Sequence, residues 1–232
     1  MQKIYVFGDS IAQGIFINEQ GHYQLSRVGC VELLIKAGSP VINYAMDGFT
    51  IRQGFASFQK KRLQPGSICV IEFGANDSEL DWDGMSVNPN RFFDGKTPLA
   101  EFPEDVERFI LEARSRDLKP ILVTPIPLMS YRYFPWICRG RNADNLLRYF
   151  RGDPESILRW QERFVHVIRE TARRYDCPLM DLRKWMVHEL DFPHLMCMDG
   201  IHPNEAGHAL IAQLVMEHYP LDATCKTAAH PV

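Results

Sequence analysis

The stretch Lys3-Ile4-Tyr5-Val6-Phe7-Gly8-Asp9-Ser10 leads from a short apolar run into a turn that carries a serine. A continuous apolar run of this length is typical of a strand buried on both faces of a parallel sheet. A serine at the carboxyl end of such a strand is well placed to act as a nucleophile. Alone, the turn is weak evidence, because Asp and Ser also cap helices and glycine makes turns in every fold. It is not a phosphate-binding loop, since no Gly-Lys-Ser/Thr ending follows.

The same alternation of apolar runs with amphipathic segments continues along the chain. It predicts β-α units, which form a parallel sheet covered by helices on both faces. The strands are predicted at residues 3–7, 40–45, 67–73, 119–123 and 178–181, and the helices at 26–38, 50–62, 98–116, 154–174 and 204–218. An apolar stripe in the fourth helix favours core packing over a cofactor site. This stripe consists of Ile157, Trp160, Phe164, Val167, Ile168 and Thr171.

The length of 232 residues suits one α/β domain, and no Gly/Ser-rich linker divides the chain. We expect a single domain over residues 1–220 and a poorly ordered tail over 221–232. Two stretches, 78–96 and 125–152, are longer than an ordinary loop between a strand and a helix. Both follow predicted strands, so we expect them to form walls of the active site.

Composition argues against several classes of partner. The formal net charge of −3 gives no reason to expect nucleic acid or a membrane surface as a partner. The arginines between 132 and 174 are interspersed with acidic residues, which favours a solvated helix face. The apolar run near the N-terminus is too short for a signal peptide, and no run approaches the roughly 18 to 20 residues of a membrane span. A cytoplasmic location is therefore expected.

The cysteine and histidine spacings predict neither a metal nor a cofactor. Six cysteines occur without a Cys-x-x-Cys pair and are expected to be free thiols, although their even number leaves a disulfide set open. The histidines from His188 to His218 form no His-x-x-x-His or His-Glu-x-x-His pattern. We therefore expect no metal site and no cofactor.

Three further segments follow predicted strands or precede the last helix. They are Asn43-Tyr44-Ala45-Met46-Asp47-Gly48, Glu72-Phe73-Gly74-Ala75-Asn76-Asp77 and Asp199-Gly200-Ile201-His202-Pro203-Asn204. Together with Gly8-Asp9-Ser10 they resemble, in content and order, the four signature blocks of the SGNH/GDSL hydrolases. The blocks span nearly the whole chain. Each could be a turn and nothing more, but a single shared site explains their joint occurrence better than four unrelated turns.

The resemblance implies a serine esterase in which Ser10 is the nucleophile, His202 its general base and Asp199 the residue that holds the imidazole. It also implies an oxyanion hole formed by the backbone N–H groups of Ser10 and Gly48 and by the side-chain amide of Asn76. The implied fold is a flavodoxin-like three-layer α/β/α sandwich. Its five-stranded parallel sheet has the strand order 2-1-3-4-5, which places the first strand between the second and third.

The chemistry of these residues supports the same roles. A serine hydroxyl needs a neighbouring base, and a histidine with a reference pKa of about 6.5 can accept its proton near neutrality. Asp199, three residues earlier, can accept the other ring N–H and fix the tautomer. Neutral donors such as backbone N–H groups and a carboxamide stabilise the negative oxygen of the tetrahedral intermediate. Asp9 is expected to hydrogen-bond the turn and not to act as an acid.

The two insertions are rich in aromatic and polar side chains, which suit a sugar ring better than a long acyl chain. They contain Trp82, Asn88, Asn90, Phe92, Phe93, Tyr131, Tyr133, Phe134, Trp136, Arg139 and Arg141. We therefore expect a small-molecule ester substrate and favour short-chain acetyl esters of carbohydrates. A lysophospholipase or thioesterase acting on longer acyl chains, and a non-catalytic ligand-binding protein, are the alternatives. The sequence indicates no oligomeric state.

Overall fold

Strand β1 (Ile4–Gly8) is buried along its whole length and has a parallel neighbour on each side. The computed structural model describes residues 2–219 of the chain. The other strands of the main sheet are β4 (Val41–Asn43), β5 (Ile68–Glu72), β6 (Lys119–Val123) and β7 (Leu179–Met180). All five are parallel and lie in the order β4-β1-β5-β6-β7. This is the predicted order 2-1-3-4-5, so the predicted sheet is confirmed.

The side chains of β1 alternate between two hydrophobic cores, one on each face of the sheet. Ile4 and Val6 pack into the first core, and Tyr5 and Phe7 pack into the second. Successive residues of a strand point to opposite faces, so a strand covered on both sides needs apolar residues at every position. The continuous apolar run at the N-terminus follows from this placement.

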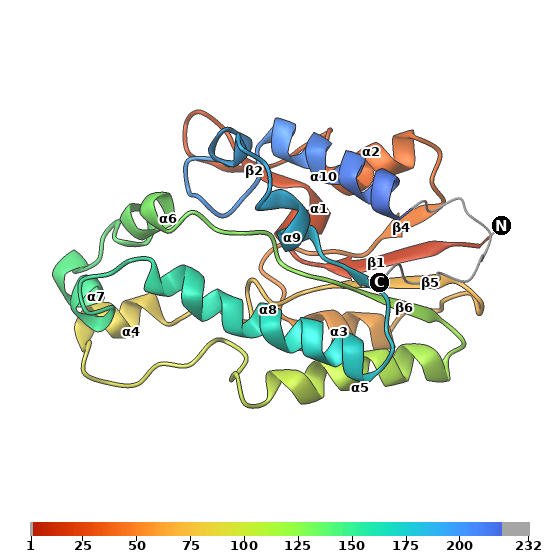
Figure 1. Cartoon of the computed structure of the whole chain (residues 1–232), viewed down its shortest axis with the longest axis horizontal. Helices are drawn as coiled ribbons and strands as arrows, with labels where there is room; N and C mark the ends of the chain where they lie inside the picture. The colour runs from red at the N-terminus through yellow and green to blue at the C-terminus, as the bar shows by residue number, and fades with distance from the viewer. Residues whose placement is uncertain (1, 220–232) are drawn as a thin grey trace.

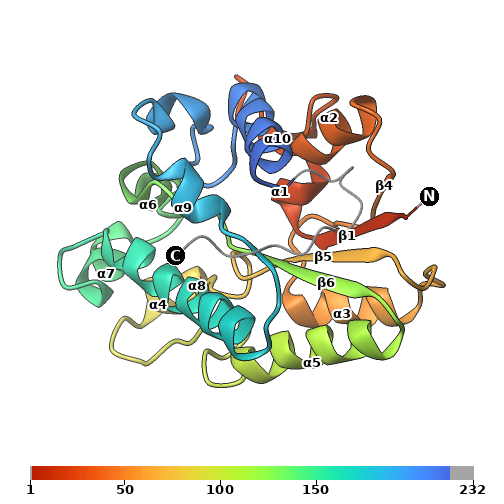
Figure 2. The ribbon, with the colours of Figure 1, turned by 45° about the vertical axis from the view of Figure 1, so that its right-hand side comes forward.

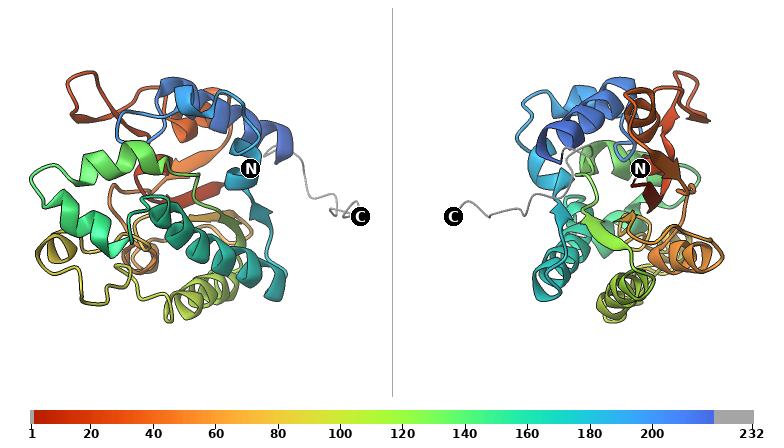
Figure 3. Two further views of the ribbon diagram at one scale, coloured as in Figure 1. Left: turned by 60° about the vertical axis from the view of Figure 1, so that its left-hand side comes forward. Right: turned by 90° about the vertical axis from the view of Figure 1, so that its right-hand side faces the viewer.

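Helices cover both faces of the sheet (Figure 1). One layer consists of α1 (Ser10–Gln13), α2 (Cys30–Lys36), α9 (Leu182–Met186) and α10 (Glu205–His218). The other consists of α3 (Ile51–Gln59), α5 (Phe102–Ser115) and α8 (Ser156–Arg174). Figures 2 and 3 show the two layers on opposite sides of the sheet, which confirms the three-layer α/β/α architecture.

The two predicted insertions fold into short helices beyond the carboxyl ends of the strands (Figure 1). These are α4 (Trp82–Val87), α6 (Ser130–Ile137) and α7 (Ala143–Tyr149). They share a third apolar cluster with the first turn of α8, to which Trp82, Tyr133, Leu146 and Ile157 contribute. This cluster fixes the insertions against the edge of the sheet where the predicted site residues lie.

Several features differ from the sequence-based expectation. A small antiparallel hairpin, β2 (Ile15–Ile17) with β3 (Tyr23–Leu25), and a short 3-10 helix, η1 (Phe192–Leu195), were not predicted. Helix α5 begins later than expected, at Phe102, because the Thr97 hydroxyl donates to Asp77 at 2.5 Å and caps no helix.

No helix of residues 2–219 is both long and apolar enough to cross a bilayer. The tail predicted at 221–232 lies outside the described residues.

Candidate active site

Ser10 is the first residue of α1 and follows directly on the turn that ends β1. The Asp9 carboxylate accepts a hydrogen bond from the Ile11 backbone N–H at 2.9 Å and so caps this short helix. Gly8 is required because a Cβ there would lie 2.5 Å from the Glu72 Oε2 and 2.9 Å from the Ala12 Cβ. The turn therefore presents Ser10 at the edge of the sheet in a fixed orientation, and the structural role expected for Asp9 is observed.

Ser10, His202 and Asp199 are connected in series by hydrogen bonds. The Ser10 Oγ lies 2.9 Å from the His202 Nε2, although 192 positions separate the two residues. The His202 Nδ1 lies 2.6 Å from the Asp199 Oδ2. An ionised carboxylate accepts and does not donate, so an imidazole that donates through Nδ1 to Asp199 can accept the serine hydroxyl proton at Nε2.

The loop that carries His202 is held by the same aspartate. Asp199 is fully buried, and its Oδ1 accepts from the backbone N–H groups of Ile201 and His202, each at 3.2 Å. Gly200 has a left-handed φ of 76°, and a Cβ at this position would lie 2.8 Å from the Met129 carbonyl oxygen. Only glycine fits this turn, which brings the imidazole to within hydrogen-bonding distance of the serine.

Asn76 lies beside Ser10 at the end of β5, and both residues line the same cavity. Its Nδ2 donates to the Asp9 Oδ2 at 3.2 Å, which leaves the second amide hydrogen available to a ligand. Gly48 lies in the turn after β4, with a φ of 73°, and its neighbour Asp47 lines the cavity. The structure thus brings Asn76 to Ser10, whereas Gly48 lies at the margin of the cavity and is not part of its lining.

Asp77 holds the loop that carries Asn76. Its carboxylate accepts from the backbone N–H groups of Gly74 and Ile51 and from the Thr97 hydroxyl. Burial raises the pKa of Asp77 to about 6 despite these donors. A turn-forming role for Asp77, one of the interpretations open from the sequence, agrees with these contacts.

Two buried carboxyl groups lie beneath the Ser10 turn. The Glu72 Oε2 accepts from the Asp9 backbone N–H at 3.1 Å. Burial raises the pKa of Asp9 to about 6, and burial together with Asp9 raises the pKa of Glu72 well above its usual range. Glu72 therefore favours its neutral form, which limits the negative charge next to a site where an oxyanion would develop.

The cavity beside Ser10 and His202 has a volume of about 250 Å³. Trp82 from the first insertion and Tyr133 from the second line it, so both insertions form part of its wall, as predicted. An adjoining cavity is lined by Trp136, Arg139 and Arg141.

Other aromatic residues of the insertions do not reach the site. Phe92 is 77% exposed and Tyr131 is 60% exposed, neither lining the cavity. Phe93 packs against Tyr149 in the third apolar cluster.

Several residues of the site were not predicted from the sequence. Tyr23, from the unpredicted hairpin, packs edge-on against the His202 ring with centroids 5.3 Å apart. Trp160 and Ile157 line the cavity, although the stripe to which they belong was expected to be only core. Gln161, the neighbour of Trp160, also lines it. The apolar stripe of α8 packs against both the sheet and the insertions. Helical periodicity alone does not show which residues of the stripe face the core and which face the cavity.

The described residues hold no metal-binding cluster, and their cysteines are unpaired. Residues 2–219 contain no group of three His, Cys, Asp or Glu side chains placed to bind a metal ion. Cys30, Cys69, Cys138, Cys177 and Cys197 are free thiols. Cys225 lies outside the described part of the chain.

Comparisons with known proteins identify the family of the chain and other proteins of the same fold. A model of the GDSL-like Lipase/Acylhydrolase family matches residues 6–210. The crystal structure of a lipase/acylhydrolase from Enterococcus faecalis is 27% identical, with a TM-score of 0.67 over 98% of this chain and 100% of that chain. The structure of a variant of an acetyl xylan esterase from Geobacillus stearothermophilus is similar in fold, with 18% identity, a TM-score of 0.63 and 97% coverage of both chains. A Bacillus subtilis protein named "Uncharacterized lipoprotein YqeF" is 24% identical over 188 residues, which cover 78% of this chain and 70% of that protein.

Proposed function

Because the chain belongs to the GDSL-like lipase/acylhydrolase family, we propose that it is a serine esterase with Ser10 as its nucleophile. The observation that carries the proposal is the hydrogen-bonded series from Ser10 through His202 to Asp199. This arrangement supplies an activated hydroxyl, an imidazole base and a group that orients the base. A protein that only binds its ligand has no chemical need for all three.

In the proposed reaction, the His202 Nε2 takes the proton of the Ser10 hydroxyl while the Oγ attacks the ester carbonyl carbon. The tetrahedral intermediate collapses when its alcohol oxygen leaves with the proton held on His202, and an acyl group remains on Ser10. Water then attacks the acyl carbon, gives a proton to His202 and releases the acid, after which Ser10 recovers its proton. The buried Asp199 carboxylate stabilises the imidazolium in both halves of the reaction.

The oxyanion hole of the proposal consists of the Ser10 backbone N–H, the free amide hydrogen of Asn76 and the Gly48 backbone N–H. The first two are supported by the common cavity of Ser10 and Asn76 and by the anchoring of Asn76 on Asp9. Gly48 is included because its neighbour Asp47 lines the same cavity.

The proposed substrates are acetyl esters of carbohydrates. A cavity of about 250 Å³ holds roughly eight waters at about 30 Å³ each, which suits a small acyl group and part of a sugar ring. Trp82, Tyr133 and Trp160 present aromatic faces to it, beside polar groups such as Gln161. The similarity in fold to an acetyl xylan esterase is consistent with this class of substrate.

Esters of longer acyl chains are the second candidate class. They are favoured by the 27% identity to a lipase/acylhydrolase that aligns over the whole of its chain. Against this class, the cavity beside Ser10 is too small for a long acyl chain unless that chain extends into the adjoining cavity lined by Trp136 and Arg141.

We also propose a cytoplasmic location for this protein. The Bacillus subtilis relative is named a lipoprotein, so the location should be measured directly.

Hydrolysis rates on p-nitrophenyl esters from acetate to palmitate, measured beside acetylated xylo-oligosaccharides, test the substrate class. The proposal predicts faster hydrolysis of acetate than of esters with eight or more acyl carbons, and release of acetate from the oligosaccharides. A rate that rises with chain length would favour the longer acyl esters and would leave the assignment of Ser10 untouched.

A further inference from the structure

Gln161 lines the active-site cavity from the N-terminal half of α8 and is only 5% exposed. Its side-chain oxygen accepts from the Arg183 Nη1 at 2.8 Å. A guanidinium group has donors and no acceptor, so the amide atom that faces it must be the oxygen. The orientation of the Gln161 amide is therefore fixed by chemistry, and its nitrogen points away from Arg183.

The two N–H donors of the Gln161 amide have no acceptor among residues 2–219. Some side-chain polar atoms of the described residues are fully buried and have no hydrogen-bond partner, and the Gln161 nitrogen is not one of them. Because it also has no partner, it is accessible to a small molecule. Since the residue as a whole is almost completely buried and lines the cavity, the accessible space next to this nitrogen is the cavity itself. The cavity thus contains a fixed donor whose partner has to come from a ligand.

Arg183 is held as firmly as the glutamine it orients. It is 4% exposed, and its Nη1 also donates to the carbonyl oxygen of Ile126, another residue of the cavity lining, at 3.1 Å. Its Nε lies 2.6 Å from the Glu162 Oε2. One arginine therefore fixes two segments of the cavity wall, the loop after β6 and the first half of α8.

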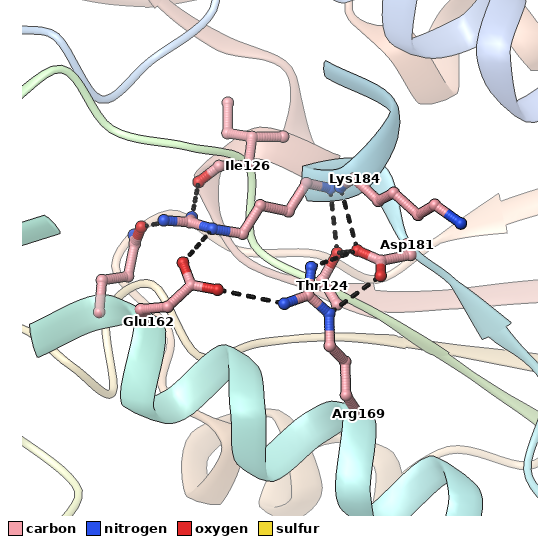
Figure 4. Close-up of polar contacts among 8 residues, drawn as sticks. Thr124, Ile126, Glu162, Arg169, Asp181 and Lys184 are labelled. Carbon is pink, nitrogen blue, oxygen red and sulfur yellow. Dashed lines mark hydrogen bonds and ion pairs between the residues drawn. The ribbon is translucent and has the colours of Figure 1, made fainter. Parts of the chain in front are cut away.

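A second arginine extends this network towards β7 (Figure 4). Glu162 bridges Arg183 to Arg169, whose Nη1 lies 3.1 Å from the Glu162 Oε1. Arg169 in turn pairs with Asp181 through two of its nitrogens, and the Thr124 hydroxyl donates to the same carboxylate at 2.9 Å. A network with so many fixed partners keeps the Gln161 amide in place without help from a ligand.

We propose that Gln161 is a specificity-determining residue whose amide donates a hydrogen bond to a substrate oxygen outside the reacting ester group. The substrate class that follows is an ester whose enclosed part bears a hydroxyl or ring oxygen, as a sugar does. This inference rests on the proposed esterase function and deepens it, because it names the group that would recognise the sugar.

The discrimination arises from the burial of the donor. A hydrocarbon chain in the cavity would displace water from the Gln161 amide and leave both N–H groups without a partner. An unpaired buried donor is costly, so sites built to hydrogen-bond a substrate oxygen reject analogues that lack it. An oxygen of a hydroxylated ring accepts from the Gln161 amide in place of the displaced water, so the donor is not left without a partner.

Two variants of Gln161 test the proposal. Gln161→Leu and Gln161→Met both remove the donor, the first with a branched and the second with an unbranched apolar side chain of similar volume. The control is Gln213→Leu, the same change at an exposed position of α10 where the amide donates to Glu217. For each protein, kcat/KM is measured on acetylated xylo-oligosaccharides and on p-nitrophenyl acetate, and methyl β-xyloside is tested as an inhibitor of the second reaction.

Both Gln161 variants are expected to lose about tenfold more in kcat/KM on the oligosaccharides than on p-nitrophenyl acetate. Inhibition by methyl β-xyloside should weaken in parallel, while Gln213→Leu should match the wild type. Equal losses on both substrates, or no loss on the oligosaccharides, would overturn the role of Gln161. If Gln161→Leu fails to fold, the Met variant decides the question.

The wild-type enzyme separates failure of this inference from failure of the proposed substrate class. Activity on p-nitrophenyl acetate with none on the acetylated oligosaccharides would overturn the carbohydrate proposal, and with it the recognition of a sugar by Gln161. Activity on both substrates with no selective effect of the variants would overturn the role of Gln161 alone.

Discussion

The side-chain amide of Asn76 donates to the carboxylate of Asp9, with the Nδ2 and Oδ2 atoms 3.2 Å apart across 67 positions of sequence. The contact joins the loop after β5 to the turn that carries Ser10. It occupies one of the two amide hydrogens and leaves the other available to a ligand in the cavity that Asn76 lines. Burial raises the pKa of Asp9 to about 6, so its carboxylate is mostly ionised at neutral pH and can serve as this anchor.

Replacement of Asn76 tests the oxyanion role. A donor to the developing oxyanion contributes more in the transition state than in the ground state, so Asn76→Ala should lower kcat by roughly 10² to 10³ and barely change KM. Asn76→Asp should be at least as damaging, because it places a carboxylate against both the oxyanion and Asp9. Steady-state kinetics and thermal melts on the same samples measure the two effects. A lowered melting temperature with wild-type kcat would assign Asn76 to the turn and not to catalysis.

The buried His208 predicts a loss of stability in mild acid. Its Nδ1 accepts from the Cys30 N–H and its Nε2 faces the Ile15 carbonyl, so the neutral ring is satisfied on both sides. Burial lowers the pKa of His208 to about 4 from an ordinary value of 6.5. As pH falls from 6.5 to 4 the unfolded chain takes up a proton that the folded protein does not bind, so the free energy of unfolding decreases across that window. The loss reaches about 3 kcal/mol near pH 4.

Denaturant unfolding of the wild type and His208→Gln between pH 7 and pH 4 measures this loss. The comparison with a variant is needed because the raised pKa values of Asp9 and Asp77 change stability with pH in the opposite sense. The wild type should lose stability relative to His208→Gln as pH falls, whereas His166→Gln, a change at an exposed position of α8, should follow the wild type. Parallel curves for the wild type and His208→Gln would rule out the contribution of His208.

Dialysis against a chelator should leave the hydrolytic activity unchanged, because every step of the proposed reaction is carried by side-chain and backbone groups of this chain. Activity on p-nitrophenyl acetate before and after exposure to EDTA measures this directly. Activity that is lost in EDTA and restored by zinc or calcium would require a metal site that the sequence spacings do not predict.

The sheet and the main site residues could be predicted from sequence because their signals are local. Each strand of the main sheet is an apolar run with a turn at its end, and parallel strands bring those ends to one edge. Ser10 and Asn76 each lie in the loop after such a strand, and His202 lies in the loop before α10, so the resemblance of these segments to one family's signature blocks predicted a common location. The oxyanion role of Gly48 stays a prediction, since the position of a turn relative to a cavity depends on the packing of the loop and not on its sequence pattern.

The residues that shape the cavity could not be predicted, because their roles arise from contacts with distant parts of the chain. Gln161 is one polar residue beside an apolar stripe, and only the folded position of Arg183, 22 residues later, fixes its amide. Tyr23 lies in a strand of three residues, too short for a periodic signal, yet it packs against His202. The aromatic residues of the insertions lie in three places, namely the cavity, the third apolar cluster and the surface. The composition of the insertions does not predict which residue lies in which place.

The most direct test of the account is the turnover of p-nitrophenyl acetate by Ser10→Ala, with Ser115→Ala, a change at an exposed position of α5, as the control. Both variants are first shown to melt cooperatively, like the wild type. Because Ser10 is the hydroxyl bonded to His202, its removal should lower kcat by at least about 10⁴, while Ser115→Ala keeps wild-type activity. A folded Ser10→Ala protein that retains most of its activity would contradict the assignment of the nucleophile.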